Sequence, residues 1–270
     1  MATRRIFDSH AHYDDERFEG GEIALLNRLH DEENVCFVLN AAAGLSSVET
    51  SKKLAEELDF VYFSSGIHPE NAHIDTENEN WLEIVKSAAS HPKCKAIGEI
   101  GLDYYYGKET EEIQKEVFKK QLQLARELSL PVIIHDREAH GDCLDIISQY
   151  PDVKGVFHSY SGSSEMAKEL LKKGWYISFN GIITFKNARK TVEVAECIKQ
   201  LEGGKYLDKI LVETDCPYLA PVPERGHTNH SGNIKYTAAK LAEILEMECD
   251  GLCELTYKNA CRFYGIEELI

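Results

Sequence analysis

The chain has 270 residues, 43% of them hydrophobic, and a formal net charge of −16 at pH 7. This length fits one α/β barrel of about 250 residues, and we expect a single domain over residues 1–270. The negative charge argues against a protein that coats long stretches of nucleic acid. It still allows an enzyme that grips one phosphodiester through metal ions, because the cations supply local positive charge.

Localisation can be read from apolar runs and cysteine spacing. No apolar run approaches the roughly 18 residues of a membrane span, and the N-terminus lacks the apolar core of a signal peptide. The eight cysteines are scattered without a C-x-x-C pair, which is typical of reduced core residues. We therefore expect a cytoplasmic protein with no membrane partner, and nothing in the sequence indicates an obligate protein partner.

Short β-rich runs alternate with longer amphipathic stretches along the whole chain. We predict strands at 6–12, 35–40, 61–67, 96–101, 132–135, 155–158, 175–180 and 210–215. We predict helices at 22–31, 46–58, 79–90, 109–129, 138–149, 163–173, 187–201, 234–246 and 250–264. Eight strands, each followed by a helix, predict one α/β domain with the (β/α)8 TIM-like barrel fold. Residues 217–233, rich in Pro, Gly and Asn, are expected to form a long loop after the last strand.

The stretch 109–129 carries the clearest helical pattern. Ile113, Val117, Leu124 and Leu128 fall on one stripe, and Pro131 follows the helix. This spacing predicts a helix that buries an apolar face.

The first residues with chemistry of interest are His10 and His12, at the end of the first predicted strand. Residues two apart on a strand point to the same side, so both imidazoles can reach one point. Such a pair is a good half-site for zinc or manganese. Taken alone, such a pair also fits one solvated histidine and one that caps the following turn.

Glu99 is a carboxylate inside an otherwise apolar predicted strand. A buried carboxylate is costly unless it is paired or bound to metal. A salt bridge is the alternative, but no strand interior here offers a Lys or Arg partner. We favour a metal ligand, and the two oxygens of a carboxylate can bridge two cations.

Three further strands also end in potential ligands, namely His135, His158 and Asp215. In a barrel, the carboxyl ends of all strands face one mouth. Six predicted ligands therefore meet there: His10, His12, Glu99, His135, His158 and Asp215. Six ligands exceed the needs of one tetrahedral zinc and suit two metals that share Glu99. Glu213, two residues before Asp215, is expected to orient a ligand or neighbouring backbone.

Other residues near the predicted mouth are candidates for substrate contact. His68 could bind a phosphate oxygen or protonate a leaving group, or it could serve only in the turn before Pro69. Arg225 is a candidate phosphate clamp, because guanidinium binds phosphate in bidentate fashion, although it could also be a solvated surface residue. Tyr104 and the two tyrosines after it could stack a base, or in part pack under the loop.

The motifs resemble the TatD family of metal-dependent deoxyribonucleases, within the amidohydrolase-like metal-dependent hydrolases. The resemblance runs nearly the whole chain. Its motifs are D-S-H-A-H at 8–12, G-I-H-P at 66–69, G-E-I-G-L-D-Y at 98–104, I-I-H-D-R at 133–137, F-H-S-Y-S-G at 157–162, V-E-T-D-C-P-Y-L at 212–219 and P-x-R-G at 223–226. The resemblance implies a TIM-like barrel, the same six metal ligands, and hydrolysis of phosphodiester bonds in DNA.

Two departures from related patterns are informative. Many members of the family have an N-E-P-type run after the Arg-Gly loop, where this chain has T-N-H-S-G-N at 228–233, which leaves substrate preference open. Relatives with a carboxylated lysine carry Lys where this chain has Glu99. This separates the chain from the classical phosphotriesterase and urease types.

The expected activity is that of a divalent-metal-dependent deoxyribonuclease, a 3′-5′ exonuclease acting on single-stranded or frayed DNA ends. One or two ions of Mg, Mn or Zn would lower the pKa of water, with Glu99 bridging the ions and Asp215 accepting the proton. Two other classes stay open. The same mouth could hydrolyse a small ester, lactone or amide, and a non-catalytic metal-binding scaffold would keep the fold.

Overall fold

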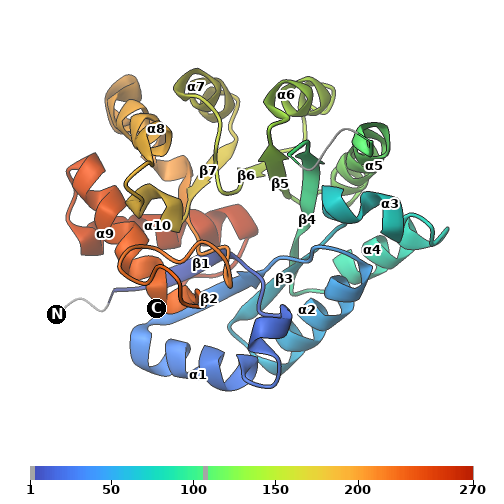
Figure 1. Ribbon diagram of the computed structural model, residues 1–270, viewed down its shortest axis with the longest axis horizontal. Helices are drawn as coiled ribbons and strands as arrows, with labels where there is room; N and C mark the ends of the chain where they lie inside the picture. Colours follow the sequence, from blue (N-terminus) through green and yellow to red (C-terminus); the bar gives the residue numbers. More distant parts are fainter. Residues whose placement is uncertain (1–3, 106–108, 270) are drawn as a thin grey trace. The chain divides into compact units, whose positions relative to one another are not determined.

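The computed structural model of the protein describes residues 4–105 and 109–269. Within them, eight strands follow one another in chain order in one sheet (Figure 1). The strands are β1 (Ile6–Ala11), β2 (Val35–Asn40), β3 (Val61–Ser65), β4 (Cys94–Asp103), β5 (Val132–Arg137), β6 (Gly155–Phe157), β7 (Tyr176–Phe179) and β8 (Ile210–Val212). The pairs β3–β4, β4–β5, β5–β6 and β7–β8 are parallel.

Helices follow every strand. They are α1 (Glu22–Glu33), α2 (Leu45–Glu57), α3 (Ala72–Asp75), α4 (Trp81–Ala89), α5 (Glu111–Leu128), α6 (His140–Ser148), α7 (Ser164–Lys172), α8 (Arg189–Gln200), α9 (Ile234–Leu245) and α10 (Cys249–Tyr264). Short 3-10 segments lie at Glu16–Phe18, Pro69–Asn71, Gly181–Thr184, Leu201–Lys209 and Ser231–Asn233. This alternation is the TIM-like (β/α)8 fold, which confirms the predicted fold class. Among the helices of the described ranges, none combines the length and apolarity needed to cross a bilayer.

The chain divides into two compact units. The terminal unit comprises residues 1–39 and 159–270, and the central unit comprises residues 40–158. The prediction of a single domain over the whole chain is not tested by this division.

The central unit is built on strands β3 to β6. Helices α4, α5 and α6 cover the outer side of these strands (Figure 1). The strand residues between are apolar and fully enclosed, as shown by Phe63, Ile97, Val132 and Ile134, each with 0% exposure. Strands buried on both faces are typical of parallel sheets covered by helices.

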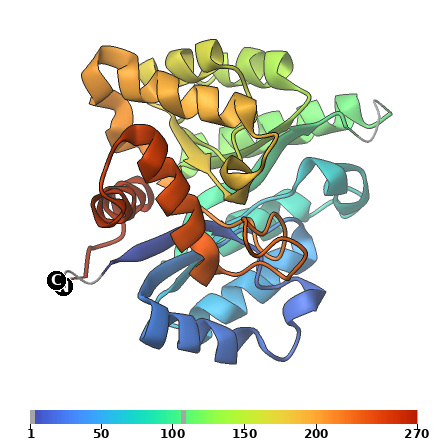
Figure 2. The same cartoon turned by 60° about the vertical axis from the view of Figure 1, so that its left-hand side comes forward.

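The terminal unit buries an aromatic cluster under its last helix. Helix α10 packs on β1 and β8 and lies beside α9 (Figure 2). The ring of Phe7 lies 5.5 Å from that of Phe37 and 5.7 Å from that of Tyr264. Gly265 ends α10 with φ +60°, the left-handed conformation that favours glycine at a helix terminus.

Several predicted boundaries need correction. The strand predicted at 96–101 extends over Cys94–Asp103, because Asp103 pairs with Arg137 of the neighbouring strand. The last strand ends at Val212 rather than at Asp215. Asp215 lies in the following loop with φ 56°, and its N–H donates to the carbonyl of His10 over 2.9 Å.

Glycines let β4 and β5 come close together around Glu99. A Cβ atom on Gly98 would lie 2.7 Å from Cβ of Ile133, and one on Gly101 would lie 2.0 Å from the carbonyl oxygen of His135. Gly101 also has φ +142°, a conformation that L-residues rarely adopt. Only glycine can therefore occupy position 101 without moving the strand that carries His135.

We predict that Gly101→Ala lowers the free energy of unfolding by about 3 kcal/mol, since it combines backbone strain with a clash. Urea unfolding followed by circular dichroism measures the effect. Gly141→Ala is the matched control, because a Cβ there meets nothing within 4 Å and φ is not left-handed. Equal stabilities of the two variants would contradict this account of β4 and β5.

Candidate metal centre

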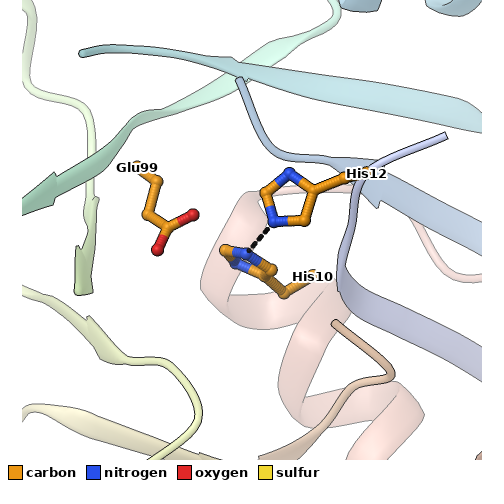
Figure 3. Close-up of side chains that lie close together, drawn as sticks. All are labelled: His10, His12 and Glu99. Carbon is orange, nitrogen blue, oxygen red and sulfur yellow. Dashed lines mark hydrogen bonds between the residues drawn. The ribbon is translucent and has the colours of Figure 1, made fainter. Parts of the chain in front are cut away.

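Three histidines of the central unit converge on one carboxylate. Glu99 is 3% exposed, and its side chain is drawn in Figure 3. Its Oε1 lies 2.7 Å from Nε2 of His158, 2.8 Å from Nδ1 of His135 and 3.4 Å from Nε2 of His68. The ligand atoms of His68, Glu99 and His135 all lie within 4.8 Å of one another, close enough to share a metal ion.

Parallel strand ends bring these side chains together. Glu99 belongs to β4 and His135 to β5, while His158 directly follows β6. His68 comes after β3, where its Nδ1 accepts the N–H of Glu70 over 3.2 Å at the start of a 3-10 turn. His68, expected from the sequence to contact substrate, thus lies in the same cluster as three predicted ligands.

Burial and neighbouring charges shift the pKa values of the cluster in different directions. Burial opposes protonation of His135, but hydrogen bonds to Asp103 and Glu99 outweigh it and raise the pKa of His135 to about 9. Burial lowers the pKa of His68, and the nearby charge of His135 lowers it further. Although burial opposes it, the hydrogen bond from His135 holds the pKa of Asp103 below its usual value.

Asp103 is a further member of this cluster that the sequence analysis missed. Its Oδ2 lies 2.9 Å from Nε2 of His135, on the side of the ring opposite the Nδ1 that faces Glu99. Carboxylates in this position orient a histidine ligand and raise its basicity. The sequence carried a signal, because Asp103 follows Glu99 by four residues and so lies on the same face of the strand.

Two buried glutamines of α5 hold the backbone around this cluster. The Oε1 of Gln121 accepts the N–H of Ile67 over 2.7 Å, and its Nε2 donates to the carbonyl of Ile67 over 3.0 Å. Gln114 clamps Asp103 in the same way, at 2.8 Å and 3.0 Å. The two glutamines are seven positions apart in the sequence, which places them on one face of the helix. Helix α5 thereby fixes the residue before His68 and the residue that orients His135.

The terminal unit holds the other three predicted ligands. Nε2 of His10 and Nε2 of His12 lie 3.0 Å apart, as the dashed line in Figure 3 marks. Oδ1 of Asp215 lies 3.3 Å from Nε2 of His12 and 3.7 Å from Nε2 of His10. Two imidazoles and one carboxylate therefore share one point, as the spacing of His10 and His12 predicts.

A buried aspartate fixes the loop that carries Asp215. Asp8 is 0% exposed, and its carboxylate accepts the N–H and hydroxyl of Thr214 at 3.0 Å and 2.6 Å and the hydroxyl of Ser231 at 2.7 Å. Burial raises the pKa of Asp8 to about 7 despite these hydrogen bonds. Asp8 thus ties β1 to the residue next to Asp215 and to the final loop.

Glu213 acts on backbone, as expected from the sequence. Its carboxylate accepts the N–H of Ser159 over 2.6 Å and the hydroxyl of Ser178 over 2.5 Å. Ser159 directly follows His158, so Glu213 fixes the chain immediately beside a predicted ligand.

The remaining candidates for substrate contact lie outside these two groups of contacts. Arg225 is exposed, and its guanidinium lies 4.0 Å from the ring centroid of Phe185. The hydroxyl of Tyr104 donates to Asp142 over 2.7 Å, and burial together with this bond raises its pKa. Tyr106 lies outside the described residues. Their predicted roles stay predictions.

The donor set suits divalent cations. The central group offers three imidazoles and the Glu99 carboxylate, and the terminal group offers two imidazoles and the Asp215 carboxylate. Mixed nitrogen and oxygen ligands of this kind fit zinc and manganese. Three imidazole nitrogens lie close to one carboxylate oxygen, so these atoms could act together as ligands of one cation. The residues therefore fit a metal ion.

We predict that Asp103→Asn lowers the affinity for Zn²⁺ or Mn²⁺ by about 10- to 100-fold, because His135 loses the carboxylate that orients it. Calorimetric titration of metal-stripped protein measures this affinity. Asp145→Asn, at an exposed position on α6, is the control. An unchanged affinity in folded Asp103→Asn protein would exclude the orienting role.

We predict that Gln121→Leu lowers the free energy of unfolding by roughly 2–4 kcal/mol, because it leaves the N–H and carbonyl of Ile67 buried without partners. The exposed amide of Gln123, on the same helix, hydrogen-bonds across the helix surface to the side chains of Glu127 and Arg126. Gln123→Leu is therefore the control in the same denaturation experiment. Comparable losses in both variants would argue against the backbone clamp.

Known proteins match this chain over nearly its whole length. The family model described as TatD related DNase matches residues 7–265. The metal-dependent hydrolase YabD of Bacillus subtilis is 38% identical over 263 residues, covering 97% of this chain and 99% of the relative. The metal-dependent hydrolase YcfH of Escherichia coli K12 is 36% identical over 272 residues, covering 97% and 96%.

A solved structure shares the fold. The crystal structure of YJJV, a TatD homolog from Escherichia coli K12, superposes with a TM-score of 0.87 at 27% identity and covers 98% of this chain and 100% of its own. The family match and the two relatives above 30% identity extend along almost the whole sequence. The chain therefore belongs to the TatD family of metal-dependent hydrolases.

Proposed function

We propose that this protein is a divalent-metal-dependent deoxyribonuclease that hydrolyses DNA phosphodiester bonds as a 3′-5′ exonuclease on single-stranded or frayed ends. The observation that carries the proposal is the buried Glu99 carboxylate with three imidazoles around one oxygen. The description of the matching family, TatD related DNase, supports DNA as the substrate.

The proposal joins the two groups of ligands in one site. His10 and His12 lie at the end of β1 and Asp215 follows β8, while Glu99 and His135 lie in β4 and β5 and His68 and His158 follow β3 and β6. In a (β/α)8 fold the carboxyl ends of the strands face the same side, where active sites lie. We infer that the six residues hold one or two ions of Mg, Mn or Zn, with Glu99 as the shared ligand.

When bound, divalent ions would lower the pKa of water and polarise the phosphoryl oxygens. Asp215 then serves as the proton acceptor, and its side chain keeps 16% exposure, so water can reach it. Arg225 donates hydrogen bonds to phosphate oxygens and stabilises the charge that develops there. His68 binds a phosphate oxygen through its neutral imidazole, because its lowered pKa disfavours the protonated form.

The preference for ends follows from charge. A net charge of −16 repels a long polyanionic duplex, and binding along such a track needs many Lys and Arg contacts. A short single strand presents few phosphates and can place one of them at the metal ligands. This is why we propose an exonuclease rather than a protein that tracks along duplex DNA.

Digestion of 5′-labelled single-stranded and duplex DNA by metal-stripped protein tests the proposal, with Mg²⁺, Mn²⁺ or Zn²⁺ added back separately. We expect a metal-dependent ladder that shortens from the 3′ end and favours the single strand. Glu99→Ala should lower the rate roughly a thousandfold or more, because it removes the shared ligand. Glu112→Ala, whose side chain is 91% exposed on α5, is the control.

Two outcomes would contradict the proposal. One is a Glu99→Ala variant that stays active with metal bound. The other is absence of cleavage with every ion by protein shown to rebind metal. In the second case, turnover of an activated carboxylic ester would point instead to a small-molecule hydrolase.

A further inference from the structure

An exposed tyrosine is stacked by an arginine beside the Glu99 cluster. The side chain of Tyr105 follows β4 and is 53% exposed. Cζ of Arg137, at the end of β5, lies 3.7 Å from its ring centroid. A guanidinium stacked on a ring in this way stiffens both side chains and adds a permanent positive charge.

This stack is joined to a predicted metal ligand. Oδ1 of Asp103 accepts the N–H of Tyr105 over 2.9 Å, and Oδ2 lies 2.9 Å from Nε2 of His135 and 4.0 Å from Nη1 of Arg137. One carboxylate therefore holds the backbone of Tyr105 and the imidazole of His135, and it lies beside the guanidinium of Arg137. The exposed ring thus belongs to a residue that is hydrogen-bonded to the same carboxylate as His135.

The terminal unit repeats the arrangement. Tyr218 is 48% exposed, and Cζ of Arg17 lies 4.1 Å from its ring centroid. The N–H of Tyr218 donates to the carbonyl of Asp215 over 3.0 Å. Asp15 accepts from Arg17 at 2.8 Å and 2.9 Å and from the hydroxyl of Tyr218 at 3.1 Å. The hydrogen bond with Arg17 lowers the pKa of Asp15 to about 2, so this support stays charged.

Both exposed rings thus lie a few residues after a predicted metal ligand, in loops at the carboxyl ends of strands. By contrast, the neighbouring Tyr104 is half-buried and its hydroxyl is bound to Asp142. An exposed, rigid ring with an adjacent cation is what unpaired bases and their phosphates bind, since each stacked base contributes about 1–3 kcal/mol without regard to sequence.

We propose that Tyr105 and Tyr218 are base-stacking platforms that bind unpaired nucleotides of a single-stranded nucleic acid. Arg137 and Arg17 hold the rings and attract the backbone. This inference rests on the proposed function and deepens it, because it names the unpaired base as the feature recognised. A base still paired in a duplex cannot extend either stack, which gives the preference for single-stranded or frayed ends a physical basis.

The test compares two single-stranded oligonucleotides of equal length, one with normal bases and one with abasic residues at its 3′ end. For the wild type, we expect removal of the bases to raise KM about 5- to 100-fold, with a smaller change in kcat. In Tyr105→Leu and Tyr218→Leu the ratio of the two KM values should fall towards one. The conservative variants Tyr105→Phe and Tyr218→Phe should keep the wild-type ratio.

Tyr150→Leu provides the matched control. Tyr150 also lies beneath an arginine, with Cζ of Arg126 at 5.6 Å, but it precedes β6 and so lies at the amino end of a strand. It should keep the wild-type ratio. Wild-type ratios in both leucine variants would overturn the inference while leaving the nuclease proposal standing.

If the wild type cleaves neither oligonucleotide with any ion, the proposed function fails, and binding decides the inference separately. Fluorescence anisotropy of labelled oligonucleotides then gives Kd for each protein. The inference is supported if Tyr105→Leu and Tyr218→Leu bind the normal strand more weakly than the wild type does and Tyr150→Leu does not. Equal Kd values for the normal and abasic strands in the wild type contradict it.

Discussion

The structure of the central unit depends on one buried carboxylate. Glu99 lies in a strand whose neighbours are apolar, at 3% exposure, and a charged group there is strongly unfavourable without partners. Histidines from three neighbouring strand ends supply them, at 2.7 to 3.4 Å from one oxygen. The same burial that makes the carboxylate costly also makes it a strong ligand for a cation, because water competes little.

The buried polar side chains around the predicted ligands form hydrogen bonds with the protein backbone. Gln114 and Gln121 clamp peptide groups of the β3 and β4 ends, while Asp8 and Glu213 do so for Thr214 and Ser159. Thr214 and Ser159 are next to the predicted ligands Asp215 and His158, Ile67 is next to His68, and Asp103 is hydrogen-bonded to His135. Rigid support of this kind keeps ligands in place before metal or substrate arrives, which is how preorganised sites gain affinity and rate.

The sequence predicts the fold class, because eight apolar runs alternate with amphipathic helices, and it predicts which strand ends carry histidine or acid. It does not predict which side chains are in contact. Gln114 and Gln121 are polar residues within a helical pattern. Their role in binding backbone is visible only when the ends of β3 and β4 are seen to lie against α5. The sequence pattern places the end of β8 at Asp215, three residues too late. The left-handed backbone of Asp215 follows Thr214, which Asp8 and Asn229 hold by hydrogen bonds from distant segments.

The account centres on Glu99 as a ligand of the divalent ions. Anomalous X-ray scattering from crystals grown with Mn²⁺ or Zn²⁺, collected at the absorption edge of the metal, tests this most directly. The account predicts anomalous density with a Glu99 oxygen about 2.0–2.2 Å away. If two ions are bound, the peaks should lie about 3.5–4 Å apart with Glu99 between them. Density confined to other residues, with Glu99 bound only to histidines, would contradict it.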